Sequence, residues 1–206
     1  MIHNMEQRSN AWHSIRLGRF TGTRMGSLLS AKSTAKYQDA IFDVVSEIIT
    51  SDYSEMRITE DMQNGIDTEP LARNEYECLF GINVHEVGFI TPENEFKDWI
   101  GISPDGLING DGLLEIKCPK AKTHLGYIKS NKMPALYYPQ VQSQLYVSGR
   151  EWCDFMSFVE NMKPFIVRVH PDAEFFALLE KELRIAIDTV KVTLDYYEKY
   201  NYLNEN

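Results

Sequence analysis

The chain has 206 residues, of which 43% are hydrophobic and 12% aromatic, enough for one substantial core, so we expect a single domain over residues 1–206. The net charge of −9 argues against indiscriminate DNA binding, and no apolar run is long enough to cross a membrane. The beginning lacks a leader pattern, and three widely spaced cysteines fit neither a zinc site nor a disulfide framework, so we expect a cytoplasmic protein.

The predicted elements change character along the chain. Apolar residues at helical spacing, with Thr21 as a capping residue, predict helices at 10–17, 24–29, 39–51 and 59–80, the last with a break near Gly65. Apolar segments bounded by turn residues then predict strands at 83–90, 99–103 and 113–118. A helix at 135–147, strands at 152–160 and 165–170, and a long amphipathic helix at 172–197 follow. This order predicts an α/β fold with a central mixed β-sheet flanked by helices.

The segment around Asp105 carries the clearest chemical signal. Asp105 lies at a turn before a Gly-rich hairpin at 107–112, which is predicted to fold the second strand back beside the first. Glu115 and Lys117 follow on that second strand and share one face, whereas Ile116 points into the core. Two carboxylates and an ammonium are therefore expected to converge. Carboxylates suit Mg²⁺ or Mn²⁺, and the set is typical of phosphodiester hydrolysis.

Each of these signals has a simpler interpretation. Asp-Gly and Asn-Gly pairs are ordinary turn residues, and Glu-x-Lys occurs on many exposed strands. The stretches 7–38 and 116–150 contain twelve of the 21 basic residues and none of the 30 acidic ones. This segregation favours a positive groove on an acidic body, although such runs can also be merely solvated faces.

Five blocks in order carry a resemblance to a known family. They are Gln7-Arg8-Ser9-x-x-Trp12-His13-x-x-Arg16-Leu17-Gly18-x-x-Thr21-Gly22-Thr23; Glu69-x-x-Ala72-Arg73-x-x-Tyr76-Glu77; Ser103-Pro104-Asp105-Gly106-Leu107; Leu114-Glu115-Ile116-Lys117-Cys118-Pro119; and Tyr137-x-x-Gln140-Val141-Gln142-x-Gln144-Leu145. The sequence resembles the lambda exonuclease and YqaJ-type viral recombinase family of the PD-(D/E)XK nuclease superfamily. The resemblance implies that superfamily's fold, a central mixed sheet flanked by helices.

The resemblance also implies roles at the carboxylate cluster. Asp105 and Glu115 match the metal-binding carboxylates, and the carbonyl of Ile116 is a further expected ligand. Lys117 matches the catalytic lysine that holds the attacking water. Glu69 matches an acid that approaches a metal from a helix.

Two helical segments carry the remaining expectations for this cluster. Pro70 suggests that Glu69 lies near a helix start, and the alternative for Glu69 is a solvated helix acid. Gln140 matches a catalytic glutamine that contacts the reacting phosphate or its water, and Tyr137, one turn earlier, is expected beside the DNA. Gln142 and Gln144 are predicted to lie on other faces of that helix, as packing or solvent residues.

The first block resembles the family's pocket for a 5′-terminal phosphate. Arg16 is expected to supply a bidentate fork, and hydroxyl donors are expected from Thr21, Thr23 and Ser103. Lys120 and Lys122 both match a basic DNA-binding position, and the sequence does not choose between them. Glu93 is the nearest match to a further family acid, with a turn acid as the equal alternative.

Together these features predict a Mg²⁺-dependent deoxyribonuclease, for which Mn²⁺ is expected to substitute. The resemblance implies 5′→3′ digestion of linear double-stranded DNA that leaves 3′ overhangs for phage-type recombination. It also implies a homotrimeric ring, a single-strand annealing partner and, for a phage gene, a bacterial cytoplasm, none of which the residues themselves decide. The alternatives are a structure-specific or flap endonuclease on the same core and a non-catalytic DNA-end-binding subunit.

Overall fold

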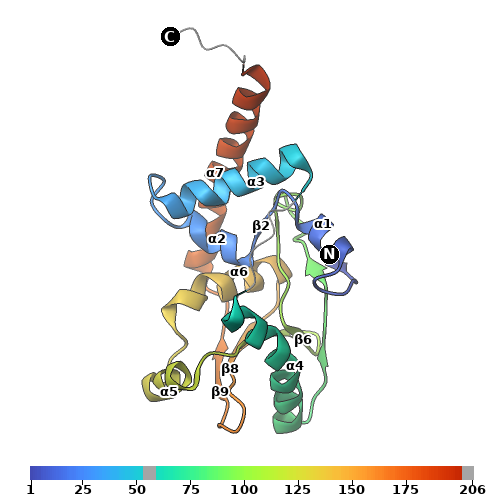
Figure 1. Cartoon of the computed structure of the whole chain (residues 1–206), viewed down its shortest axis with the longest axis vertical. Coiled ribbons are helices and arrows are strands. Elements are labelled where there is room, and N and C mark those ends of the chain that lie inside the picture. The colour runs from blue at the N-terminus through green and yellow to red at the C-terminus, as the bar shows by residue number, and fades with distance from the viewer. Residues whose placement is uncertain (53–58, 201–206) are drawn as a thin grey trace.

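The computed structural model describes residues 1–52 and 59–200 (Figure 1). Its α-helices are α1 (Asn10–Arg16), α2 (Gly22–Leu28), α3 (Ala35–Thr50), α4 (Glu60–Phe80), α5 (Ala121–Ser130), α6 (Tyr138–Ser148) and α7 (Ala173–Lys199), and the 3-10 helix η1 (Ala135–Tyr137) precedes α6. Its strands are β1 (Ile2–His3), β2 (Phe20–Thr21), β3 (Val84–His85), β4 (Phe89–Ile90), β5 (Ile100–Gly101), β6 (Gly106–Ile108), β7 (Gly112–Lys117), β8 (Trp152–Ser157) and β9 (Phe165–Val169). Within this described part, no helix is both long and apolar enough to cross a membrane.

The central sheet has five strands in the order β3-β6-β7-β8-β9. Strands β7 and β8 are parallel over six residue pairs, from Gly112 opposite Trp152 to Lys117 opposite Ser157. The other three pairings are antiparallel. Helices α5 and α6 form the crossover between the two parallel strands, as such a connection requires. The predicted central mixed sheet flanked by helices is confirmed.

The two faces of β7 pack against different helices. Leu114 and Ile116 join Ala72 and Tyr76 of α4 in one buried cluster. Leu113 faces the opposite way and belongs to the main core, with residues of α6 and of the more distant helices α2, α3 and α7. Because strand side chains alternate, Glu115 and Lys117 lie on the α6 face of the sheet.

The strand that folds back on β7 differs from the one predicted. The hairpin partner is β6, which begins directly after Asp105, and Asn109 in the intervening turn has a φ of 49°. Segment 99–103 instead supplies β5, which pairs with β2 in parallel. The predicted strand 83–90 is likewise split, because β3 joins the central sheet whereas β4 pairs with β1.

Two helical segments also differ from expectation. Helix α4 runs without interruption past Gly65, from the Thr59 cap to the left-handed Gly81, and contains Pro70 in its interior. Glu69 is therefore in the middle of a helix, and the predicted position near a terminus is wrong. Helix α5 was not predicted, because it buries only His124 and so lacks an apolar stripe. The buried imidazole instead bonds to the Ser157 hydroxyl and the Lys163 carbonyl.

Candidate active site

Asp105, Glu115 and Lys117 converge at the end of β7. The Oδ2 atom of Asp105 accepts a hydrogen bond of 2.6 Å from the backbone N–H of Ile116, which ties the segment before β6 to β7. Glu115 is only 1% exposed, and Lys117 forms an ion pair with its Oε1 atom. The predicted sharing of one face by Glu115 and Lys117 is confirmed.

Two glutamines from α6 complete the environment of Glu115. Gln140 Nε2 lies 2.6 Å from Glu115 Oε1, and Gln144 Nε2 lies 2.6 Å from Glu115 Oε2. The expectation that Gln144 faces elsewhere is wrong, because residues four apart on a helix are neighbours on one face. The spacing from Gln140 carried that signal. Gln142 does turn away, bonding to the carbonyl of His170 and the N–H of Asp172.

The close carboxylates change the protonation of the cluster. Burial raises the pKa of Asp105 well above its ordinary value, and the negative charges of Glu115 and Glu69 raise it further. Burial alone acts to lower the pKa of Lys117, but the carboxylates of Glu115 and Asp105 outweigh it, so the pKa of Lys117 is raised. Lys117 is therefore an ammonium at neutral pH, suited to orienting a water or a phosphate oxygen rather than to removing a proton.

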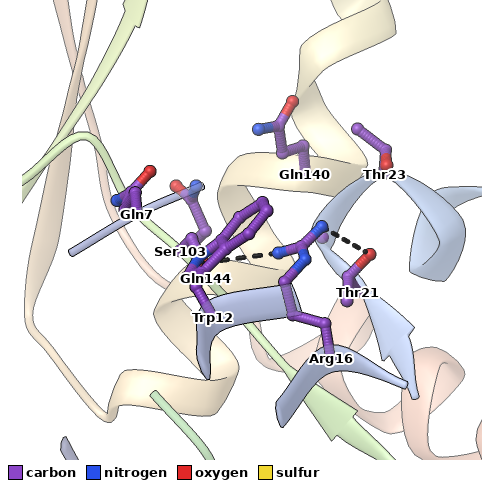
Figure 2. A pocket seen from close by; sticks show the side chains of 9 residues that line it. Gln7, Trp12, Arg16, Thr21, Thr23, Ser103, Gln140 and Gln144 are labelled. Carbon is purple, nitrogen blue, oxygen red and sulfur yellow. Dashed lines mark hydrogen bonds between the residues drawn. The ribbon is translucent and has the colours of Figure 1, made fainter. Parts of the chain in front are cut away.

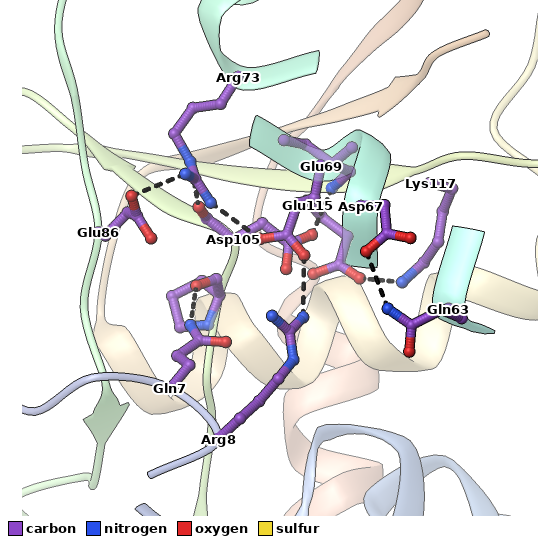
Figure 3. Close-up of polar contacts among 12 residues, drawn as sticks. Gln7, Arg8, Gln63, Asp67, Glu69, Arg73, Glu86, Asp105, Glu115 and Lys117 are labelled. Carbon is purple, nitrogen blue, oxygen red and sulfur yellow. Dashed lines mark hydrogen bonds and ion pairs between the residues drawn. The ribbon is translucent and has the colours of Figure 1, made fainter. Parts of the chain in front are cut away.

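Glu69 approaches this cluster from α4 but is already paired. Arg73, one turn later on the same helix, donates to Glu69 Oε1 at 2.8 Å. Arg8, whose own φ of 69° is left-handed, contacts Glu69 Oε2 at 3.3 Å (Figure 3). Arg73 also donates to the carbonyl of Asp105 at 3.2 Å and pairs with Glu86 at 2.7 Å. Two arginines thus neutralise the carboxylate of Glu69 in this structure.

The oxygen donors fit a hard divalent cation. Within residues 1–52 and 59–200, no group of three or more His, Cys, Asp and Glu side chains is arranged to hold a metal. Mg²⁺ usually binds through one or two carboxylates together with substrate phosphate, and the chemistry of the Asp105 and Glu115 pair is compatible with that mode. Burial and the negative charges of Glu115 and Glu69 raise the pKa of Asp105, and a bound cation would oppose that rise.

A cavity of about 140 Å³ adjoins the cluster (Figure 2). Its lining residues are Gln7, Trp12, Arg16, Thr21, Gly22, Thr23, Ser103, Gln140 and Gln144. The structure therefore brings together the four residues predicted for the terminal-phosphate pocket. It adds Gln7 and Trp12, which lie in the same sequence block as Arg16 but for which the sequence analysis predicts no role.

Arg16 is held rigidly in this cavity. Its guanidinium carbon lies 3.9 Å from the centre of the Trp12 ring. The two terminal nitrogens donate to Ser103 Oγ at 3.3 Å and to Thr21 Oγ1 at 3.4 Å. Burial and the positive charge of Arg24 lower the pKa of Arg16 to about 10, which leaves the guanidinium charged at neutral pH. A fixed guanidinium beside hydroxyl groups is suited to binding a phosphate.

Four further predicted residues lie in different surroundings. The Tyr137 ring stacks on Phe155 and lies 5.3 Å from Lys117 Nζ, at the edge of the cluster. Lys120 and Lys122 are exposed at the start of α5, and Lys120 pairs with Asp61 at 3.0 Å. Glu93 does not join the cluster, because it pairs with the terminal amine at 3.5 Å and lines a separate cavity.

Residues 7–38 include no acidic residue, but the fold brings acidic side chains from other segments close to them. Arg24 pairs with Glu47 of α3 at 2.6 Å, and Lys32 pairs with Glu182 of α7. Arg8 pairs with Glu69, as described above. The predicted positive groove is therefore partly neutralised along this stretch, because among the described residues acidic side chains of other helices pair with Arg8, Arg24 and Lys32.

Residues 11–151 match the model of the YqaJ-like viral recombinase domain. The chain belongs to this family. The matched range includes the whole Glu115 cluster and the Arg16 cavity except Gln7. No curated protein gave a significant sequence match.

Solved structures agree with membership of the YqaJ-like family. The chain is 31% identical to LHK-Exo, an alkaline exonuclease from Laribacter hongkongensis, with a TM-score of 0.85 over 93% of this chain and 97% of that chain. LHK-Exo in complex with dAMP gives 30% identity, the same TM-score and the same coverage. A phage-related exonuclease from Haemophilus somnus 129PT, 14% identical with a TM-score of 0.66 over 87% and 96% of the two chains, supports the fold alone. The predicted PD-(D/E)XK nuclease-like fold is confirmed.

Proposed function

We propose that this chain is a metal-dependent 5′→3′ exonuclease that acts on the ends of linear double-stranded DNA and leaves 3′ single-stranded overhangs. One observation carries the proposal: Gln140 and Gln144 both line the cavity around Arg16 and both donate to Glu115. A cavity suited to a terminal phosphate thus adjoins carboxylates suited to phosphodiester hydrolysis. Family membership and the similarity to alkaline exonucleases support the same class of activity.

Each group of the cluster has a defined task in this proposal. Asp105 and Glu115, with the carbonyl of Ile116, would hold Mg²⁺ or Mn²⁺. The bound cation supplies Lewis acidity at the phosphoryl oxygen and lowers the pKa of water. Lys117 orients the attacking water through its ammonium, and Gln140 positions the reacting phosphate. Glu69 can contribute only if Arg73 and Arg8 release its carboxylate.

The remaining residues bind and orient the DNA. Arg16 contacts the 5′-terminal phosphate through its fixed guanidinium, with hydroxyl donors from Thr21, Thr23 and Ser103. Tyr137 lies beside the strand next to Lys117, and Lys120 and Lys122 bind backbone phosphate farther along the duplex. We also propose a ring of three copies, a single-strand annealing partner and a role in phage-type recombination in a bacterial cytoplasm, on family membership alone.

The test compares linear duplex DNA carrying 5′-phosphates with a matched covalently closed circle, each with and without Mg²⁺. Metal-dependent release of nucleotides from the linear substrate alone supports the proposal, and strand-specific end labels determine the polarity. Cleavage of the circle would replace it with an endonuclease. Binding of ends without cleavage of either substrate would indicate a non-catalytic DNA-end-binding subunit.

A further inference from the structure

We propose that Gln144 is a positioning residue that fixes the orientation of the Glu115 carboxylate, so that only Oε1 of Glu115 is presented to the metal and the substrate. The inference rests on the proposed function of this site. Gln144 itself need touch neither metal nor DNA.

The first support is the division of partners between the two oxygens of Glu115. Oε1 accepts hydrogen bonds from Lys117 and Gln140, both of which are partly exposed. Oε2 accepts a hydrogen bond from Gln144, which, like Glu115, is 1% exposed. The buried oxygen thus has a buried donor, whereas the accessible oxygen has donors that a bound cation or phosphate can displace. A carboxylate held in this way cannot rotate freely to present both oxygens.

The second support is that only one of the two polar atoms of the Gln144 amide forms a hydrogen bond. Its Nε2 atom donates to Glu115, but its Oε1 atom is buried without a hydrogen-bond partner among the described residues. Leaving a buried acceptor unpaired is unfavourable, and a leucine or methionine would fill the same space without that penalty. A side chain needed only for packing would not be a glutamine here. The donor toward Glu115 is what distinguishes glutamine at this position.

The same helix provides a matched control. Gln142 is equally buried at 1% exposed, but it bonds to the carbonyl of His170 and the N–H of Asp172, far from Glu115 in the hydrogen-bond network. Replacing Gln142 by methionine removes two structural hydrogen bonds. Replacing Gln144 by methionine removes one bond to Glu115. A loss of general stability should therefore be at least as large for Gln142→Met as for Gln144→Met.

The experiment measures Mn²⁺ binding to the DNA-free protein by electron paramagnetic resonance, with thermal unfolding in EDTA alongside. We expect Gln144→Met to weaken Mn²⁺ binding on the order of tenfold, the usual effect of removing a hydrogen bond to a metal ligand, and Gln142→Met to leave it unchanged. Gln144→Leu is measured in the same way if the methionine variant does not fold. Unchanged Mn²⁺ affinity in a folded Gln144 variant, or equal weakening in both variants, would overturn the proposal.

A rate measurement separates this inference from a direct role of Gln144 in the cavity. A positioning role predicts that Gln144→Met slows digestion of 5′-phosphorylated and 5′-hydroxyl ends by the same factor. Unequal slowing with unchanged Mn²⁺ affinity would assign Gln144 to the DNA end instead. If the wild-type protein neither binds Mn²⁺ nor cuts linear DNA, the proposed function itself fails. Wild-type binding and cutting together with an unaffected Gln144 variant would refute only the positioning role.

Discussion

The guanidinium of Arg16 lies over the ring of Trp12, with 3.9 Å between its central carbon and the ring centre. Its terminal nitrogens donate hydrogen bonds to Ser103 and Thr21 and remain available to a phosphate. Trp12 is itself anchored, because its indole N–H lies 2.8 Å from Ser103 Oγ and 2.9 Å from the Gly88 carbonyl. The guanidinium of Arg16 is therefore held in place in the cavity before a phosphate binds.

Replacing Arg16 by alanine should slow digestion of 5′-phosphorylated ends roughly tenfold or more, because charge-assisted hydrogen bonds to the phosphate are lost. The 5′-hydroxyl ends should lose much less. Initial rates on the two end types provide the measurement. Lys36→Ala, an exposed change in the same sequence stretch, serves as the control and should leave both rates unchanged. Equal losses on both ends would make Arg16 a structural residue or a general phosphate contact.

Asp105→Asn should abolish cleavage yet stabilise the metal-free protein. The folded protein raises the pKa of Asp105 above its ordinary value of 3.8, so it binds more protons than the unfolded chain as the pH rises through that range. The stability of the metal-free wild type therefore falls with rising pH at this site, and the charge is unfavourable at neutral pH. We expect the melting temperature of Asp105→Asn in EDTA to rise by roughly 2–4 °C at pH 7. An increase that is equally large at pH 4 would assign it to another cause.

Glu115→Gln should also abolish cleavage but should have the opposite effect on stability. Its carboxylate accepts from Lys117, Gln140 and Gln144, and an amide would direct its own N–H₂ group toward some of these donors. Loss of a buried charge partner costs about 3 kcal/mol, and we expect the free energy of unfolding measured by urea titration in EDTA to fall by about that amount. DNA binding in EDTA should be retained, because the Arg16 cavity is intact. A variant that still turns over substrate at the wild-type rate would remove Glu115 from the site.

Neutralising Lys120 and Lys122 together should reduce the salt dependence of DNA binding. Each phosphate contact contributes about 0.9 to the slope of log affinity against log salt concentration, so the double glutamine variant should lose up to about 1.8. The loss should not depend on DNA sequence. Lys199→Gln, at the far end of α7, provides the control. An unchanged slope in the double variant would exclude both lysines from the DNA contact.

Local periodicity explains which parts of the site could be predicted. Glu115 and Lys117 were placed on one face because alternation along a strand depends only on neighbouring residues. The prediction that Gln144 lies on another helix face than Gln140 is wrong although the signal is local, since a spacing of four residues is about one helical turn. Glu69 was misplaced because Pro70 favours helix starts, whereas packing against the sheet maintains α4 around it.

Features that depend on distant contacts could not be predicted in the same way. Strands β2 and β5 have two residues each, too few to show a period, and they exist because the chain brings them together. The pairing of Arg24 with Glu47 and of Lys32 with Glu182 likewise arises only on folding. The order of the blocks is a property of the sequence and carries the resemblance to a family, whereas the neutralisation of the basic stretch depends on contacts that form only in the folded chain.

Ser103 at the cavity and Asp105 at the carboxylate cluster are separated by a single residue, Pro104. Two successive peptide units place their Cα atoms at most about 7.6 Å apart, and proline restricts the backbone between them. If Ser103 binds the terminal phosphate and Asp105 holds the metal, the length of main chain between them fixes which phosphodiester bond is cut. Side-chain substitutions would then change how fast the enzyme works, whereas the size of each released product would change only when a residue is inserted or deleted within this segment.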